Sequence, residues 1–186
     1  MPNYTIIAGV NGVGKSSLTG VLKAERNDLG FIIDVDRIAV ENKCSPIDAG
    51  KIALKRISEY LSKGVSFSQE TTLSGQRTQR TVKLAKGKGY TVRLFYIGLN
   101  TADECHKRIQ NRVEKGGHYV DTKDVERRHG KRFDDLKKIL PYCDEVSFFD
   151  NENGFIEVGE YRNGEVISKG GYIPLWLSEL LRSADR

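Results

Sequence analysis

The chain has 186 residues, of which 38% are hydrophobic and 30% are charged. This composition excludes an intrinsically disordered protein and is typical of one globular domain, here residues 1–186. The net charge of +5 is compatible with nucleic acid as a partner, or with cations gathered around a polyphosphate. Three well-separated cysteines without a C-x-x-C pair favour reduced thiols over a disulfide or a zinc site.

The hydropathy pattern predicts a cytoplasmic protein. No apolar run approaches the roughly 18 residues that a membrane-spanning helix needs. The first residues, MPNYTIIAGVNG, carry neither a basic segment nor a long apolar segment of the kind found in secretory signals. We therefore expect no membrane partner.

The first 90 residues alternate between strand and helix patterns. Strands are predicted at Tyr4–Ala8, Phe31–Asp34 and Val65–Glu70. Helices are predicted from Ser16 to about Arg26, from Pro46 to about Lys63, and from about Gln76 to Lys86. Ser45 is expected to cap the second helix, whose apolar face includes Ile47 and Ile57.

The alternation continues to about residue 150. A strand is predicted at Tyr90–Leu99, and Thr101 with Glu104 forms a capping box for the next helix. The inner face of that helix is expected to hold Cys105, Ile109 and Val113. A further helix begins at Thr122, with an apolar line of Val125, Phe133, Leu136 and Leu140, and a fifth strand follows at Glu145–Asp150.

The last part of the chain, residues 152–186, has a different pattern. It predicts a hairpin that turns at Asn163-Gly164 and a short closing helix that carries Trp176. Helices between strands elsewhere predict a mostly parallel sheet of about five strands, covered on both faces. In such sheets the ligand crevice lies beyond the carboxyl ends of the strands.

The stretch GVNGVGKSS, Gly9–Ser17, follows the first strand and matches the phosphate-binding pattern G-x-x-x-x-G-K-[ST]. Its glycines let successive backbone N–H groups face one anion, and Lys15 supplies a cation for the β- and γ-phosphates. The Ser16 hydroxyl is the predicted ligand of Mg²⁺. Nucleotide contacts are expected from Gly9, Asn11, Gly12, Val13, Gly14, Lys15, Ser16 and Ser17. The fold class is therefore a P-loop NTPase of three α/β/α layers.

The nucleotide is predicted to be ATP. A GTPase would need a guanine-reading N-K-x-D motif, and the nearest string, Asn42–Ser45, lacks the aspartate and occurs too early. Phosphoryl transfer needs a group that takes the proton of an acceptor hydroxyl. Asp34 and Asp36, after the second strand, can do this, and alternation places both on one side. Their alternative role is a helix cap or an ion pair with Arg37.

Polar residues at the end of the third strand are candidate substrate contacts. Glu70 could hold Mg²⁺ through water, grip an acceptor hydroxyl or cap the next helix. The candidate substrate-binding residues are Asp34, Glu70, Thr71, Thr72, Arg77 and His118.

Arginines after the fourth strand are candidate stabilisers of the charge on a transferring phosphoryl group. Arg108 and Arg112 lie one helical turn apart, and further cations follow at Arg127, Arg128, Lys131 and Arg132. For any one of them a solvated helix face is the ordinary alternative.

The sequence resembles the zeta-toxin-like P-loop kinases, in their short single-domain branch. The resemblance covers Tyr4 to about Asn151 and rests on the ordered blocks GVNGVGKSS, IDVDRIA, FSQETTLSG, AKGKGYTVRLFYIGL, RIQNRVEKGGHYV, DVERRHGKRFDDL and FFDN. It implies ATP-dependent phosphorylation of the 3′-hydroxyl of the amino sugar in UDP-N-acetylglucosamine. An antitoxin protein is a possible partner.

The resemblance also implies roles for single residues. Lys15 and Ser16 would bind ATP and Mg²⁺, Asp36 would be the base, Glu70 would contact the acceptor sugar, and Arg112 would stabilise the γ-phosphate. Family members carry a further catalytic arginine shortly after that position, where this sequence has GGH. His118, Arg127 or Arg128 takes its place, and Arg128 is the residue we predict to be catalytic.

Other functions are compatible with these residues. A polynucleotide 5′-hydroxyl kinase fits the positive charge, but the sequence has no aromatic and basic stacking stripe. Another P-loop small-molecule kinase, or an ATP-binding module without catalysis, would carry the same loop.

Overall fold

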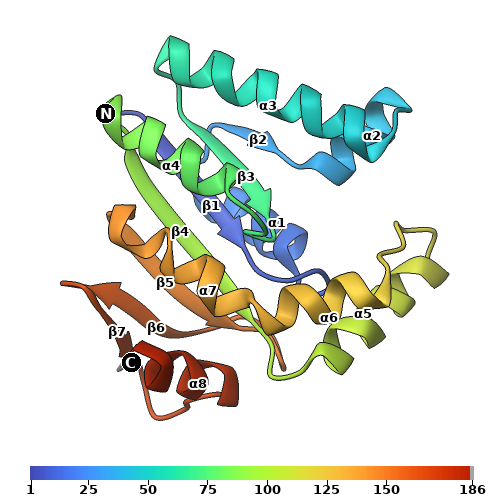
Figure 1. Cartoon of the computed structure of the whole chain (residues 1–186), viewed down its shortest axis with the longest axis vertical. Helices are drawn as coiled ribbons and strands as arrows, with labels where there is room; N and C mark the ends of the chain where they lie inside the picture. The colour runs from blue at the N-terminus through green and yellow to red at the C-terminus, as the bar shows by residue number, and fades with distance from the viewer. Residues whose placement is uncertain (185–186) are drawn as a thin grey trace.

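The computed structural model describes residues 1–184 and contains one continuous β-sheet (Figure 1). Its strands are β1 (Asn3–Ala8), β2 (Phe31–Ile33), β3 (Phe67–Thr71), β4 (Thr91–Gly98), β5 (Glu145–Asp150), β6 (Ile156–Arg162) and β7 (Glu165–Ser168). Their order is β2-β3-β1-β4-β5-β6-β7, and the first five strands in this order are parallel. The predicted five-stranded parallel sheet is confirmed.

The helices occupy the predicted places with two exceptions: the helix at Val35–Asn42 was not predicted, and the helix predicted from Thr122 is divided in two. They are α1 (Lys15–Glu25), α2 (Val35–Asn42), α3 (Pro46–Lys63), α4 (Arg77–Gly87), α5 (Ala102–Glu114), α6 (Thr122–Gly130), α7 (Arg132–Lys137), the 3₁₀ turn η1 (Leu140–Tyr142) and α8 (Leu175–Ala184). Ser45 caps α3 by accepting the backbone N–H of Asp48, and Thr101 with Glu104 forms the predicted capping box of α5. None of the helices in residues 1–184 is long and apolar enough to cross a membrane.

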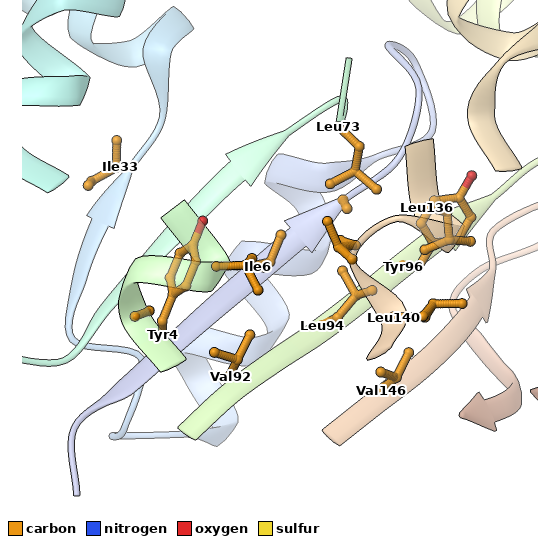
Figure 2. Packing of buried hydrophobic residues seen from close by; sticks show 14 of the residues in the cluster. Tyr4, Ile6, Ile33, Leu73, Val92, Leu94, Tyr96, Leu136, Leu140 and Val146 are labelled. Carbon is orange, nitrogen blue, oxygen red and sulfur yellow. The ribbon is translucent and has the colours of Figure 1, made fainter. Parts of the chain in front are cut away.

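Two hydrophobic clusters lie on opposite faces of the sheet, because alternate side chains of a strand point to opposite sides. Tyr4 and Ile6 of β1 belong to the cluster under α3, α4 and α8, and Ile7 belongs to the cluster with α1 and α5. Figure 2 shows Tyr4 and Ile6 of the first cluster beside Val92 and Leu94 of the neighbouring strand. The central strand β1 is therefore buried on both faces, as the three-layer class requires.

The C-terminal hairpin extends the sheet to seven strands. β6 pairs antiparallel with β5, and β7 pairs antiparallel with β6. Asn163 and Gly164 have φ of +54° and +88°, which fits the type I′ turn predicted from this pair. Trp176 of α8 is buried, and its Nε1 donates a 2.8 Å hydrogen bond to Asp150 at the end of β5. The tail is thus joined to the core through the last parallel strand.

Several local predictions were wrong. The strand predicted to reach Asp34 ends earlier, because Asp34 caps the helix α2. This helix was not predicted, since it buries only Ile38 and so shows a weak apolar pattern. The helix predicted from Thr122 is divided at Lys131 into α6 and α7. Ile47 and Val113 are exposed, since the buried faces of their helices pass through other positions.

Candidate active site

The loop between β1 and α1 has the curled backbone that the phosphate-binding pattern predicts. Gly9, Gly12 and Gly14 have φ of +148°, +87° and +100°, values that L side chains rarely adopt. A Cβ on Gly12 would lie 2.5 Å from the backbone oxygen of Cys105 in α5. The loop therefore requires glycine both for its conformation and for the close approach of α5.

Lys15 closes over this loop. Its Nζ donates hydrogen bonds of 2.9 Å to the carbonyl oxygen of Gly9 and 3.1 Å to that of Val10. Burial lowers the pKa of Lys15 to about 8, and the nearby carboxylates of Glu70 and Asp36 oppose this effect. The ammonium group is thus held at the place where an anion on the loop would meet it.

Glu70 connects the end of β3 to the phosphate-binding loop. Its carboxylate accepts hydrogen bonds of 2.8 Å from the Ser16 hydroxyl and 2.7 Å from the Thr19 hydroxyl. Burial raises the pKa of Glu70, while these two hydrogen bonds oppose the rise. The alternative role as a helix cap is wrong, because Gln76 occupies the cap position of α4.

Asp34 and Asp36 are placed differently from each other. The Asp34 carboxylate accepts the backbone N–H groups of Asp36 (2.9 Å) and Arg37 (3.3 Å) and so caps α2. The expectation that strand alternation puts both on one side is wrong, because Asp36 lies in the first turn of α2. The Asp36 side chain is exposed and has no hydrogen-bond partner within residues 1–184. Arg37 pairs with Glu41 instead of either aspartate.

Arginines of α5 and α6 lie near the phosphate-binding loop. Arg128 donates a 2.5 Å hydrogen bond to the Asn11 side chain, and Arg112 donates a 2.6 Å bond to the carbonyl oxygen of His118. Arg108 donates to the carbonyl oxygen of Asn151. The Nε atoms of Arg112 and Arg128 are buried without a protein partner among the described residues. All three arginines line a cavity beside the loop.

A cavity of about 770 Å³ joins most of these groups. We call one part the P-loop end, lined by Asn11, Gly12, Gly14, Lys15, Ser16, Ser17, Arg108, Arg112, Arg128 and Asn151. The other part, the α3–α4 end, is lined by Gly50, Ala53, Leu54, Ile57, Gln69, Thr71, Thr72, Arg77, Thr78 and Thr81. Asp34, Asp36 and Glu70 lie at the carboxyl edge of the sheet, between the two ends.

Six of the candidate residues do not line the cavity. Gly9 and Val13 belong to the loop but not to the cavity lining, and the exposed side chain of His118 lies outside. The lining also lacks Arg127, Lys131 and Arg132. The described residues contain no cluster of three or more His, Cys, Asp or Glu side chains that could hold a metal ion. A Mg²⁺ ion that relies on one hydroxyl, substrate phosphates and water does not need such a cluster, and the Ser16 and Glu70 oxygens fit that kind of site.

Asn151 is a site residue that the sequence analysis did not predict. Its side-chain amide donates a 2.8 Å hydrogen bond to the carbonyl oxygen of Val13 in the loop, and Asn151 is buried. Its position directly after β5, at the carboxyl edge of the sheet, could have identified it as a candidate site residue. Thr19 of α1, whose hydroxyl donates to Glu70, was missed as well.

A glycine-rich loop between a parallel strand and a helix, with a lysine closed over it, defines a P-loop protein of the α/β class. The chain belongs to the same family as an uncharacterized protein of Haemophilus influenzae. The two are 36% identical over 126 residues, which cover 64% of this chain and 88% of the other. No protein-family model matches the sequence.

Solved structures share the fold at low sequence identity. A structure from the PezAT chromosomal toxin-antitoxin system of Streptococcus pneumoniae has a TM-score of 0.65 and 17% identity, and the match covers 100% of this chain and 85% of that one. AvrRxo1-ORF1:-ORF2 with ATP has a TM-score of 0.69 and 14% identity, and the match covers 99% of this chain but only 63% of that one. The predicted fold class is therefore confirmed.

Proposed function

We propose that the protein is an ATP-dependent phosphotransferase that moves the γ-phosphate to a hydroxyl of a nucleotide sugar. One observation carries the proposal: a single cavity of about 770 Å³ is lined both by the phosphate-binding loop and by residues of α3 and α4. Asp36 lines the same cavity, and its carboxylate has no hydrogen-bond partner among residues 1–184. A nucleotide-binding module without catalysis needs only the P-loop end.

ATP is the proposed phosphate donor. The backbone N–H groups of the loop and the Lys15 ammonium bind its phosphates, with the positive end of α1 adding to the attraction. A structural neighbour was solved with ATP, which supports this choice. The Ser16 hydroxyl would hold Mg²⁺, with Glu70 next to it. When bound, the ion neutralises phosphate charge.

The proposed reaction is an in-line displacement at the γ-phosphorus. The acceptor hydroxyl oxygen forms the new P–O bond, the bond to the β–γ bridging oxygen breaks, and ADP leaves. Asp36 takes the proton of the acceptor hydroxyl as general base. Arg112 and Arg128 stabilise the charge that spreads over the transferring group, since both guanidinium-bearing side chains line the P-loop end.

The proposed acceptor is UDP-N-acetylglucosamine or a related nucleotide sugar, as the resemblance to zeta-toxin-like kinases implies. Thr72 and Arg77, which line the α3–α4 end, are its proposed contacts. A 5′-hydroxyl nucleic acid is the second candidate, which the net charge of +5 favours.

The test is a transfer assay with γ-labelled ATP and Mg²⁺. Separate reactions contain UDP-N-acetylglucosamine, a panel of other nucleotide sugars, and 5′-hydroxyl DNA or RNA. We expect label on a nucleotide sugar, and loss of transfer in Lys15→Ala. Label on the nucleic acid alone would replace the first candidate by the second. ATP binding without label on any acceptor would favour the non-catalytic module.

A protein partner is also proposed, since one structural neighbour comes from a toxin-antitoxin system. Such a partner would bind near the cavity and block transfer. Co-expression with the product of the adjacent gene tests this. Co-purification with loss of label transfer supports it, and full transfer in the presence of that product contradicts it.

A further inference from the structure

Gln69 of β3 is held by a buried tyrosine of the neighbouring strand. The Tyr4 hydroxyl donates a 2.6 Å hydrogen bond to Oε1 of Gln69. Tyr4 is fully buried, and its ring stacks on Phe67 with ring centroids 4.5 Å apart. Burial raises the pKa of Tyr4, so the hydroxyl keeps the proton that it donates to Gln69. Figure 2 shows the Tyr4 ring on the same face of the sheet as Ile6, which lies opposite Gln69 in the register.

This hydrogen bond orients the Gln69 amide, because it engages Oε1 and leaves Nε2 to donate elsewhere. Because Oε1 faces Tyr4, the Nε2 group points away from it, and it has no protein acceptor within residues 1–184. Gln69 lines the α3–α4 end of the cavity. A group with two N–H donors is thus presented to the cavity by a side chain whose orientation is set from beneath.

The surroundings of Gln69 are mostly neutral. Ala53, Leu54 and Ile57 of α3 form an apolar wall. The hydroxyls of the nearby threonines are largely engaged, because Thr78 bonds to Thr71 and Thr81 donates to the backbone of α4. Arg77, in the first turn of α4, is the cation that lines this end.

We propose that Gln69 is a specificity-determining residue that donates its Nε2 hydrogens to an oxygen of the acceptor's uncharged part, and that Tyr4 is its positioning residue. The ligand chemistry is a neutral carbonyl or hydroxyl oxygen beside an apolar face. A carboxylate or phosphate belongs nearer Arg77. This assignment rests on the proposed function, since it needs an acceptor at the α3–α4 end.

The experiment measures kcat and the KM for ATP and for the acceptor in Gln69→Glu, Gln69→Met and Tyr4→Phe. The acceptor is the nucleotide sugar that the unaltered protein labels in the transfer assay, with UDP-N-acetylglucosamine and UDP-glucose in the panel. Both Gln69 substitutions remove the donor at nearly constant length. We expect acceptor KM to rise at least tenfold, with KM for ATP within twofold, because the site loses a hydrogen-bond donor aimed at the substrate. Tyr4→Phe should raise acceptor KM about threefold with little change in kcat.

Gln79→Glu is the matched control, since it makes the same chemical change on α4 outside the cavity lining. An unchanged acceptor KM in both Gln69 variants overturns the assignment while leaving the proposed function standing, and so does an equal rise in the KM for ATP. If the unaltered protein labels no nucleotide sugar of the panel, the proposed function fails at that step and the Gln69 assignment falls with it. If one Gln69 variant does not fold, the other answers the same question.

Discussion

The Ser16 hydroxyl donates a 2.8 Å hydrogen bond to the Glu70 carboxylate, joining the first turn of α1 to the end of β3. The second oxygen of Glu70 accepts from Thr19, one turn further along the helix. Glu70 therefore orients the hydroxyl that we propose as the Mg²⁺ ligand, and its charge lies next to the loop.

Glu70→Gln is predicted to slow label transfer by about 10²-fold or more, because it removes a charge that orients the proposed metal site. Steady-state assays over a range of Mg²⁺ concentrations measure this, and the variant should need more Mg²⁺ for half-maximal rate. Thr19→Val is the control. It removes only one of the two hydrogen bonds, and it should cost about 1 kcal/mol of stability with a much smaller effect on Mg²⁺ dependence.

Asp36→Asn is predicted to lower kcat by about 10²–10⁴-fold while ATP still binds, because the amide cannot take the acceptor proton. Asp34→Asn should keep most of the activity, since asparagine also caps helices well. Asp34→Ala should lower the stability of the fold by about 1 kcal/mol through loss of the α2 cap. Transfer assays and nucleotide titrations distinguish these outcomes. Loss of turnover in Asp34→Asn with full turnover in Asp36→Asn would reverse the assignment of the base.

Arg128→Ala is predicted to slow transfer by about 10–10³-fold, because it removes a guanidinium that reaches the loop at Asn11. Arg127→Ala is the matched control. Arg127 is the adjacent residue on α6, but its side chain is 54% exposed and does not line the cavity, so its loss should change the rate by no more than about twofold. Single-turnover transfer with saturating ATP measures the effect on chemistry. Equal effects of the two substitutions would remove Arg128 from the site.

The fold was largely predictable because its signals are local and repeated. Apolar strands buried on both faces, helix caps such as Ser45 and Thr101, and the Asn163-Gly164 turn each specify their own element. The short helix α2 was not predictable in this way, because a single buried side chain, Ile38, leaves almost no periodic pattern. That β6 and β7 would join the main sheet depends on pairing with β5, which no local pattern encodes.

The site was predictable where a motif carries its own chemistry. The glycines and Lys15 of the loop could be assigned from spacing alone. The contacts of Glu70 with α1, of Arg128 with Asn11, and of Asn151 with the loop join segments from 51 to 138 residues apart in the chain. Such contacts follow from the order of the strands, so the sequence indicates the edge where they meet but not the partners.

Asn151→Ala is predicted to weaken both stability and nucleotide binding. The substitution leaves the buried carbonyl of Val13 without its donor, which costs about 1–3 kcal/mol. Because Val13 belongs to the loop, the KM for ATP should rise as well. Asn153→Ala is the control, since Asn153 is exposed two residues later. Urea unfolding and ATP titration measure the two effects, and a loss of stability without any change in ATP binding would restrict Asn151 to a structural role.

Asp28→Asn is predicted to destabilise the fold in a pH-dependent manner. The Asp28 carboxylate accepts two hydrogen bonds of 2.9 Å from Arg26 and a further one from Arg93, a side chain that is 15% exposed. The hydrogen bonds from Arg26 are the largest cause of a pKa far below the usual range for this carboxyl. A lowered pKa in the folded state contributes stability that is complete above the unfolded pKa of about 3.9 and is lost as the pH falls below it.

The substitution should therefore cost about 1–2 kcal/mol at pH 7, and the difference from the unaltered protein should shrink below about pH 4. Urea unfolding at pH 7, 5 and 3 measures this. Glu59→Gln is the control, because its pair with Lys63 is exposed and should contribute too little to resolve at any of these values. A constant difference between the Asp28 variant and the unaltered protein from pH 7 to pH 3 would mean that packing of the side chain, not its charge, holds this corner of the sheet.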